Sequence, residues 1–298
     1  MSKPSDLLSP DTIERLRHLE LFSRLRVEGF LSGESRSLML GTSTDFVSHR
    51  PYFPGDEIRH IDWRVFGRSD RLVIKRFEDW RNLSAIIALD VSNSMAFGNG
   101  GLTKHQYAVR CAALILYLMH LQRDSFSLYL FNERLRTVVP AGTGRRCLLA
   151  AFTALVTSAP ADRTSFEVSL AEIEPQAPRR GLLILLSDCM DAPEKIARSL
   201  SRFRAGGTDV IVFQVVHPAE RDLPYNQVSR FTCLETGSVS NVDPLEIRNA
   251  YREQFALHTR ELRAELLRRG MDHWELTVDE NYEKALGDYL TKRMELLS

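Results

Sequence analysis

Three oxygen-bearing side chains follow a short apolar run, where they could bind a metal ion together. Asp90, Ser92 and Ser94 stand at alternate positions after residues 85–89. In a chain that is still nearly extended, alternate side chains point to the same side. Carboxylate and hydroxyl oxygens, with no sulfur or imidazole among them, suit Mg²⁺ or Mn²⁺ rather than zinc. The segment therefore predicts a hard-metal site at the tip of a buried strand.

A second apolar run, residues 182–186, also ends in oxygen ligands. Asp188 follows this run, and Thr164 lies in the polar loop that precedes it along the chain. Ligands of open α/β sheets bind beyond the carboxyl ends of the strands, so we expect Asp188 and Thr164 to join Asp90. Thr157 and Ser165 are alternatives to Thr164, because they carry hydroxyls in the same part of the sequence.

The hydrophobic pattern predicts that strands and helices alternate along most of the chain. Strands are expected over residues 72–80, 85–90, 125–131, 135–139, 182–186, 209–216 and 273–277, with a two-stranded excursion over 228–242. Helices are expected over residues 9–31, 103–122, 193–205, 244–270 and 281–297, and another runs from a cap at Thr143 through residues 147–149 to Val156. This alternation is typical of the α/β class, with a doubly wound, mostly parallel sheet of Rossmann type.

The same pattern suggests how the chain is divided. We expect a small N-terminal helical and β extension at residues 1–83, the α/β domain at 84–278, and a C-terminal helix at 279–298 that packs on it. The whole chain of 298 residues is long enough for about two domains of ordinary size.

Composition argues against several classes of function. Lysine plus arginine and aspartate plus glutamate number 39 each, so no net charge attracts nucleic acid. The apolar runs fall short of the roughly 20 residues that cross a bilayer, and the first residues do not resemble a signal peptide. We therefore expect no membrane span and a cytoplasmic location. The four cysteines are singly spaced, which is not the pattern of a zinc site or of a disulfide framework.

Motifs of common enzymes are missing from the sequence. Residues 142–146 (Gly-Thr-Gly-Arg-Arg) lack the lysine of a phosphate-binding loop, and the sequence has neither a Gly-x-Ser-x-Gly nor a His-Glu-x-x-His motif. Two alternatives to a binding function stay open. The oxygen ligands could serve a metal-dependent phosphatase or nuclease, or they could be vestigial in a structural scaffold.

The Asp-x-Ser-x-Ser motif at residues 90–94, with Thr164 and Asp188, resembles the metal-ion-dependent adhesion site of von Willebrand factor A domains. This resemblance implies that Ser92 and Ser94 bind the ion directly, that Asp90 and Asp188 bind it directly or through water, and that Thr164 is the loop ligand. It also implies that an acidic side chain of a partner protein fills the remaining position. Cys189 stands where many A domains have glycine, so we expect a thiol at the rim.

A second motif, over residues 52–63, narrows the resemblance. Tyr-x-Pro-Gly-Asp-x-x-Arg-x-Ile-Asp-Trp resembles a motif of the domain-of-unknown-function family numbered fifty-eight. Its members are A-domain-like proteins encoded beside MoxR-type AAA+ ATPases. The resemblance implies a non-enzymatic adaptor that couples such an ATPase to a client protein. Many relatives have N-terminal transmembrane helices, whereas this sequence is expected to be the short cytosolic form. The motif itself is interpreted as an internal salt-bridged lock or as a recognition surface.

Overall fold

The computed structural model describes residues 46–52, 62–69, 71–77, 83–179 and 181–297. It divides the chain into two compact units, one that contains the residues from Leu83 onward and one within residues 32–82. The helix expected at residues 9–31 lies outside the described residues, as do residues 53–61 of the second motif.

The smaller unit contains a two-stranded antiparallel ribbon and one short helix. Strand β1 (Phe46–Pro51) pairs with β2 (Val73–Phe77), and helix α2 (Trp63–Ser69) lies between them in sequence. Asp62 begins the helix, because its carboxylate accepts hydrogen bonds from the backbone N–H groups of Arg64 and Val65 at 3.0 and 3.3 Å. The predicted strand at residues 72–80 is thus present from Val73 to Phe77.

The larger unit is built on a six-stranded sheet in the order β10-β7-β6-β3-β4-β5. All neighbours in it are parallel except β4 and β5, which form the expected antiparallel edge. Its strands are β3 (Ser84–Asp90), β4 (Ser125–Phe131), β5 (Leu135–Gly142), β6 (Leu182–Ser187), β7 (Asp209–Val216) and β10 (Asp272–Thr277). The predicted doubly wound α/β fold is confirmed.

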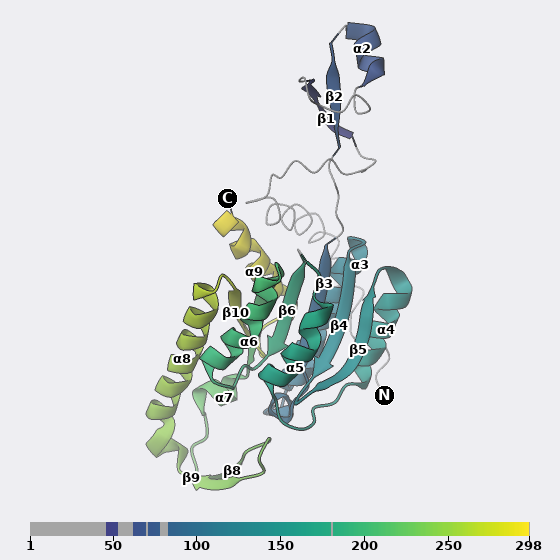
Figure 1. The fold of residues 1–298 in the computed structure, drawn as a ribbon. Coiled ribbons are helices and arrows are strands. Elements are labelled where there is room, and N and C mark those ends of the chain that lie inside the picture. The colour runs from purple at the N-terminus through teal and green to yellow at the C-terminus, as the bar shows by residue number, and fades with distance from the viewer. Residues whose placement is uncertain (1–45, 53–61, 70, 78–82, 180, 298) are drawn as a thin grey trace. The chain divides into compact units, whose positions relative to one another are not determined.

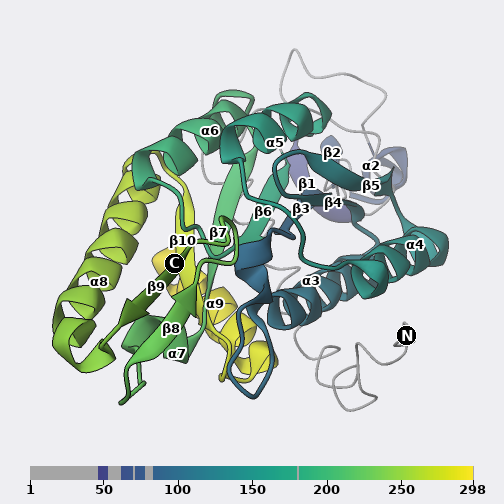
Figure 2. The same ribbon diagram turned by 90° about the horizontal axis from the view of Figure 1, so that it is seen from below.

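Helices cover both faces of this sheet (Figures 1 and 2). On one face lie α3 (Lys104–Leu121), α4 (Gly144–Thr157) and α9 (Tyr282–Leu297), and on the other α5 (Phe166–Ile173), α6 (Pro193–Ala205) and α8 (Pro244–Arg268). The central strand β3 supplies both cores, since Ile87 and Leu89 belong to the first and Ile86 and Ala88 to the second. A strand buried on both faces needs a continuous apolar run, which residues 85–89 provide.

Shorter elements complete the unit. They are the 3₁₀ helices η3 (Asn93–Ala96) and η4 (Glu174–Gln176), helix α7 (Pro218–Asp222), and the antiparallel strands β8 (Ser229–Thr232) and β9 (Val239–Val242). Strands β8 and β9 form the excursion predicted over residues 228–242. Figure 1 shows this ribbon beyond the carboxyl ends of the parallel strands, together with α7.

The order of the strands reverses between β3 and β6. The chain leaves β3 toward α3 on one face and leaves β6 toward α6 on the other, so the two connections diverge. In register, Leu89 of β3 is opposite Leu186 of β6, so the residues that follow these two come out side by side. Such a switch point is where open α/β sheets bind ligands.

Among the described residues, no helix is both long and apolar enough to cross a bilayer.

Gly181, directly before β6, lies in close contact with Ser84 and Pro178. A Cβ at this position would lie 2.5 Å from the carbonyl oxygen of Ser84 and would overlap the ring of Pro178. Gly181→Ala should therefore lower the free energy of unfolding by about 1–3 kcal/mol, as overpacked sites do. Urea denaturation measures the change. Gly101→Ala is the control, because a Cβ there meets nothing within 4 Å. An equal effect of the two variants would contradict the close approach at Gly181.

Candidate metal centre

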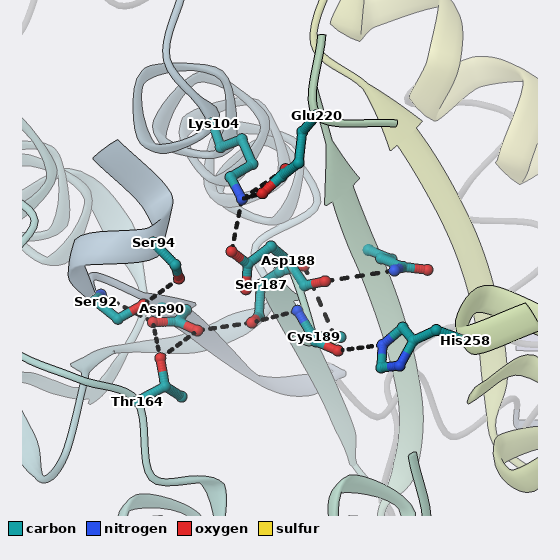
Figure 3. A network of polar contacts seen from close by, with 11 residues as sticks. Asp90, Ser92, Ser94, Lys104, Thr164, Ser187, Asp188, Cys189, Glu220 and His258 are labelled. Atoms are coloured by element: carbon teal, nitrogen blue, oxygen red, sulfur yellow. Dashed lines mark hydrogen bonds and ion pairs between the residues drawn. The ribbon is translucent and has the colours of Figure 1, made fainter. Parts of the chain in front are cut away.

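The structure brings all five predicted site residues together at the switch point (Figure 3). Asp90 ends β3, Ser92 and Ser94 follow it, Thr164 precedes α5, and Asp188 follows β6. Asp90, Ser92 and Asp188 are buried, whereas Ser94 and Thr164 are partly exposed. The site therefore has a buried floor of carboxylates and a more open side with two hydroxyls.

Asp90 is the centre of the hydrogen-bond network. Its Oδ1 accepts from the backbone N–H of Ser92 at 2.9 Å, and its Oδ2 accepts from the hydroxyl of Ser187 at 2.7 Å. The hydroxyl of Thr164 lies 3.3 Å from both carboxylate oxygens. The hydroxyls of Ser92 and Ser94 lie 3.0 Å from each other. These contacts fix the orientation of the carboxylate and gather the hydroxyl oxygens beside it.

Thr164 is the loop hydroxyl that reaches Asp90. The hydroxyl of Thr157 instead donates to the carbonyl of Thr153 within α4 at 2.9 Å, and Ser165 stands at the N-cap of α5. Two backbone hydrogen bonds fasten this loop to the end of β3: Ala161 N–H to the carbonyl of Val91, and Asn93 N–H to the carbonyl of Asp162, both at 2.8 Å.

Asp188 is held by a buried lysine that the sequence analysis did not identify. The Nζ of Lys104, in the first turn of α3, lies 2.7 Å from Oδ2 of Asp188 and 2.8 Å from Oε2 of Glu220. The lysine is fully buried. Burial lowers the pKa of Lys104, but the two carboxylates outweigh burial and the net shift is upward, so the ammonium stays charged. We call these three residues the lysine triad.

Asp90 has no such cation. Within the described residues, its contacts are hydrogen bonds from hydroxyls and a backbone N–H, with no lysine or arginine among them. Burial and, next, the charge of Asp188 raise the pKa of Asp90 from 3.8 to about 7. Two neighbouring carboxylates with a single ammonium leave negative charge unbalanced in a buried site, an arrangement that favours a bound cation.

The set of donors fits a hard divalent cation. Mg²⁺ and Mn²⁺ take oxygen ligands, and Ser92, Ser94, Thr164, Asp90 and Asp188 offer only oxygens. Across the part of the chain that is described, no group of three His, Cys, Asp or Glu side chains is placed to hold a metal. At this place the two carboxylates do not make a metal site alone, and the hydroxyls of Ser92, Ser94 and Thr164 supply the further oxygens.

Cys189 differs from what the sequence predicted. The thiol was expected at the rim, but Cys189 is fully buried and belongs to the core between the sheet, α5 and α6. The backbone there is left-handed, with φ of 56°, a conformation that favours glycine because it has no Cβ. This left-handed backbone directs the thiol of Cys189 into the core, and the amino-acid pattern does not reveal such a backbone conformation.

A cavity of about 510 Å³ opens over the cluster. Ser94, Thr164 and Asp188 line it on the side of the sheet, and Glu220 of α7 and Glu235 of the β8–β9 turn also line it. The partly exposed hydroxyls of the site therefore face a space large enough for a side chain of another molecule.

Comparison with known proteins places the chain in a family. Residues 48–265 match the family described as "Protein of unknown function DUF58". The chain belongs to this family. In this DUF58 protein the larger unit is a doubly wound α/β domain, as the strand order and the helices on both faces show.

Relatives of this DUF58 protein occur in mycobacteria. It is 29% identical over 268 residues to the uncharacterized protein Rv1480 of Mycobacterium tuberculosis, a match that covers 88% of this chain and 82% of the relative. The uncharacterized protein Mb1516 of Mycobacterium bovis matches to the same extent.

Solved structures are also similar to it. The conserved hypothetical protein BatB from Bacteroides thetaiotaomicron is 16% identical, with a TM-score of 0.49 over 72% of this chain and 100% of that chain. The SpRpn10 VWA domain is 9% identical, with a TM-score of 0.41 over 70% of this chain and 95% of that chain.

Removing the lysine of the triad should destabilise the protein. Lys104→Met leaves Asp188 and Glu220 buried without their cation, a change that typically costs about 3–5 kcal/mol. Urea denaturation in EDTA measures it. Lys195→Met is the matched control, because Lys195 is largely exposed and its contact with Asp191 spans 3.9 Å, so its loss should cost less than about 1 kcal/mol. A loss at Lys104 no larger than at Lys195 would contradict the role of the triad.

Asp90→Asn should stabilise the metal-free protein at pH 8. The pKa of Asp90 is about 7 in the folded state and near 3.8 in the unfolded state, so the folded state holds the proton more tightly. The stability of the wild type in EDTA then falls as pH rises through this window, and the variant avoids the loss. We expect a gain of about 1–4 kcal/mol at pH 8 and a smaller gain at pH 5.

Thermal or urea denaturation at the two pH values provides the test. His105 and His273, whose pKa values burial lowers to about 4, are common to both proteins, so the difference between variant and wild type isolates Asp90. A variant less stable than the wild type at pH 8 in EDTA would show that the carboxylate is not an uncompensated charge.

Proposed function

We propose that this protein is a non-enzymatic, metal-dependent adaptor that binds an acidic residue of a partner protein. One observation carries the proposal: five oxygen-bearing side chains from three segments converge at the switch point of the sheet, and three of them, Ser94, Thr164 and Asp188, line a cavity. The uncompensated charge of Asp90 supplies the reason for a cation at this place.

The ion in this proposal is Mg²⁺ or Mn²⁺. Ser92 and Ser94 are its direct ligands, Asp90 and Asp188 hold it directly or through water, and Thr164 binds from the loop. When bound, the ion provides a Lewis-acidic point that attracts a carboxylate. The residues of the chain hold the ion, orient it toward the cavity and keep water from the buried side. The remaining ligand is an acidic side chain of the partner.

The partners in this proposal follow from the family resemblance. They are a MoxR-type AAA+ ATPase and a client protein that offers the acidic residue, and the adaptor serves the maturation or remodelling of a client complex. The proposal keeps the cytoplasmic location expected from the sequence. A phosphatase or nuclease that uses the same ligands, or a scaffold with a vestigial site, would be the alternative.

Replacing both serines should abolish metal-dependent binding. Ser92→Ala/Ser94→Ala removes the two hydroxyls that lie 3.0 Å apart and that the proposal assigns to the ion. We expect Mn²⁺ affinity to fall at least about tenfold, since ligand number sets affinity for hard cations. Isothermal titration calorimetry measures it. In parallel, retention of the client protein on immobilised adaptor should require Mg²⁺, disappear in EDTA, and be missing with the variant.

The matched control is Ser199→Ala/Ser201→Ala. Both of these hydroxyls donate to carbonyls within α6, at 3.0 and 2.6 Å, so their loss should leave ion and partner binding unchanged. Equal capture of the client protein by the Ser92/Ser94 variant in Mg²⁺ and in EDTA would refute the metal-dependent mechanism. Hydrolysis of a phosphomonoester or of nucleic acid in Mn²⁺, lost in Asp188→Asn, would establish the enzyme alternative instead.

A further inference from the structure

The turn between β8 and β9 carries one side chain that differs from its neighbours. Residues 232–238 are exposed except for Glu235, which is partly buried. The turn is held by its own hydrogen bonds, from Cys233 N–H to the carbonyl of Ser238 and from Gly237 N–H to the carbonyl of Cys233, both at 2.8 Å. The φ of Gly237 is 71°, which glycine adopts without strain. The turn is therefore compact, and Glu235 is its one side chain that is partly buried.

Glu235 faces the candidate metal centre, because it lines the same cavity as Ser94 and Thr164. Hydrogen bonding from the hydroxyl of Ser94 and from the backbone N–H of Thr164 lowers the pKa of its carboxyl. Its main-chain carbonyl accepts from Nε of Arg163 at 3.2 Å, which fastens the turn to the same loop. It also lines the cavity together with Asp188. A segment from the crossover between β7 and β10 thus delivers a carboxylate to the open side of the site.

The charge of this side chain needs an explanation. Asp188 already lies at the site, and a second carboxylate beside it in a partly buried place is repelled. The charge of Arg163 lowers the pKa of Glu235, but burial and, next, the charge of Asp188 outweigh it, so the net shift is upward. A glutamine could make the same hydrogen bonds without the charge. A carboxylate is the better choice where a cation lies among Ser94, Thr164 and Asp188.

We propose that Glu235 is an internal ligand that occupies the coordination position meant for the acidic residue of the partner. The inference rests on the proposed function and adds a regulation to it. The β8–β9 hairpin closes the site while no partner is present, and a partner must displace Glu235 to reach the ion. The partner is therefore a protein that presents an aspartate or glutamate on a protruding segment, able to enter the cavity in place of the turn.

The test compares wild type, Glu235→Gln and Glu235→Ala with Mn²⁺ as the probe. Water proton relaxation reports how many exchangeable waters the bound ion keeps, and calorimetry reports its affinity. We expect Glu235→Ala to admit about one more water and to bind Mn²⁺ several-fold to tenfold more weakly, because one charged ligand is lost. Glu235→Gln should lose affinity to a similar degree, although it can keep the hydrogen bonds.

Acetate serves as a surrogate for the carboxylate of the partner. It should displace the extra water from Mn²⁺ in Glu235→Ala and leave the relaxation of the wild type unchanged. Asp191→Asn is the matched control, since Asp191 also lines the cavity but contacts Ala192 and Lys195 rather than the hydroxyls of the site. Thermal melting in EDTA verifies that each variant is folded.

The outcomes separate the two proposals. If the wild type binds Mn²⁺ and the Ser92/Ser94 variant does not, while Glu235→Ala matches the wild type in affinity and in bound water, the internal ligand is refuted and the metal site stands. If the wild type does not bind Mn²⁺, both proposals fall. Loss of affinity in Glu235→Ala but not in Glu235→Gln would also refute the inference, because the hydrogen bonds and not the charge would then matter.

Discussion

The site depends on one electrostatic constraint: two buried carboxylates must sit at adjacent strand ends. Parallel pairing of β3 with β6 places Asp90 and Asp188 there, and the register leaves no freedom to separate them. Lys104 is shared between Asp188 and Glu220, and no lysine or arginine of the described residues contacts Asp90, so negative charge is in excess at this edge. Most other polar contacts of this edge, from Ser187, Thr164 and the amide of Ser92, serve to hold Asp90 in place despite that imbalance.

The lysine triad links this edge to the rest of the molecule. Lys104 belongs to α3, whose N-terminus is fixed by reciprocal bonds between Thr103 and Gln106, each at 3.1 Å. Glu220 belongs to α7, which follows β7. The ammonium of Lys104 therefore connects the first turn of α3 with the loop after β6 and with helix α7. The floor of the site is thus held from three separate segments of the chain.

The sequence was informative where local pattern decides structure. Continuous apolar runs identified β3, β6 and β7 because these strands are buried on both faces, and alternating oxygens after β3 identified Asp90, Ser92 and Ser94. Lys104 escaped notice because its partner lies 84 positions away, and nothing in a lysine at a helix start signals burial. Glu235 was visible only as part of a turn. Cys189 was misplaced because a left-handed backbone, invisible in the sequence, sends its thiol into the core.

The short hairpin that carries Glu235 also sets how strong a competitor has to be. A carboxylate that the fold holds beside its site is present at an effective concentration on the order of millimolar or higher. One acidic side chain of a free partner at micromolar concentration cannot win such a competition through the ion alone. The partner has to gain binding energy elsewhere, from surfaces around the cavity. Selectivity would then come from that wider interface, while the ion decides only where the acidic residue docks.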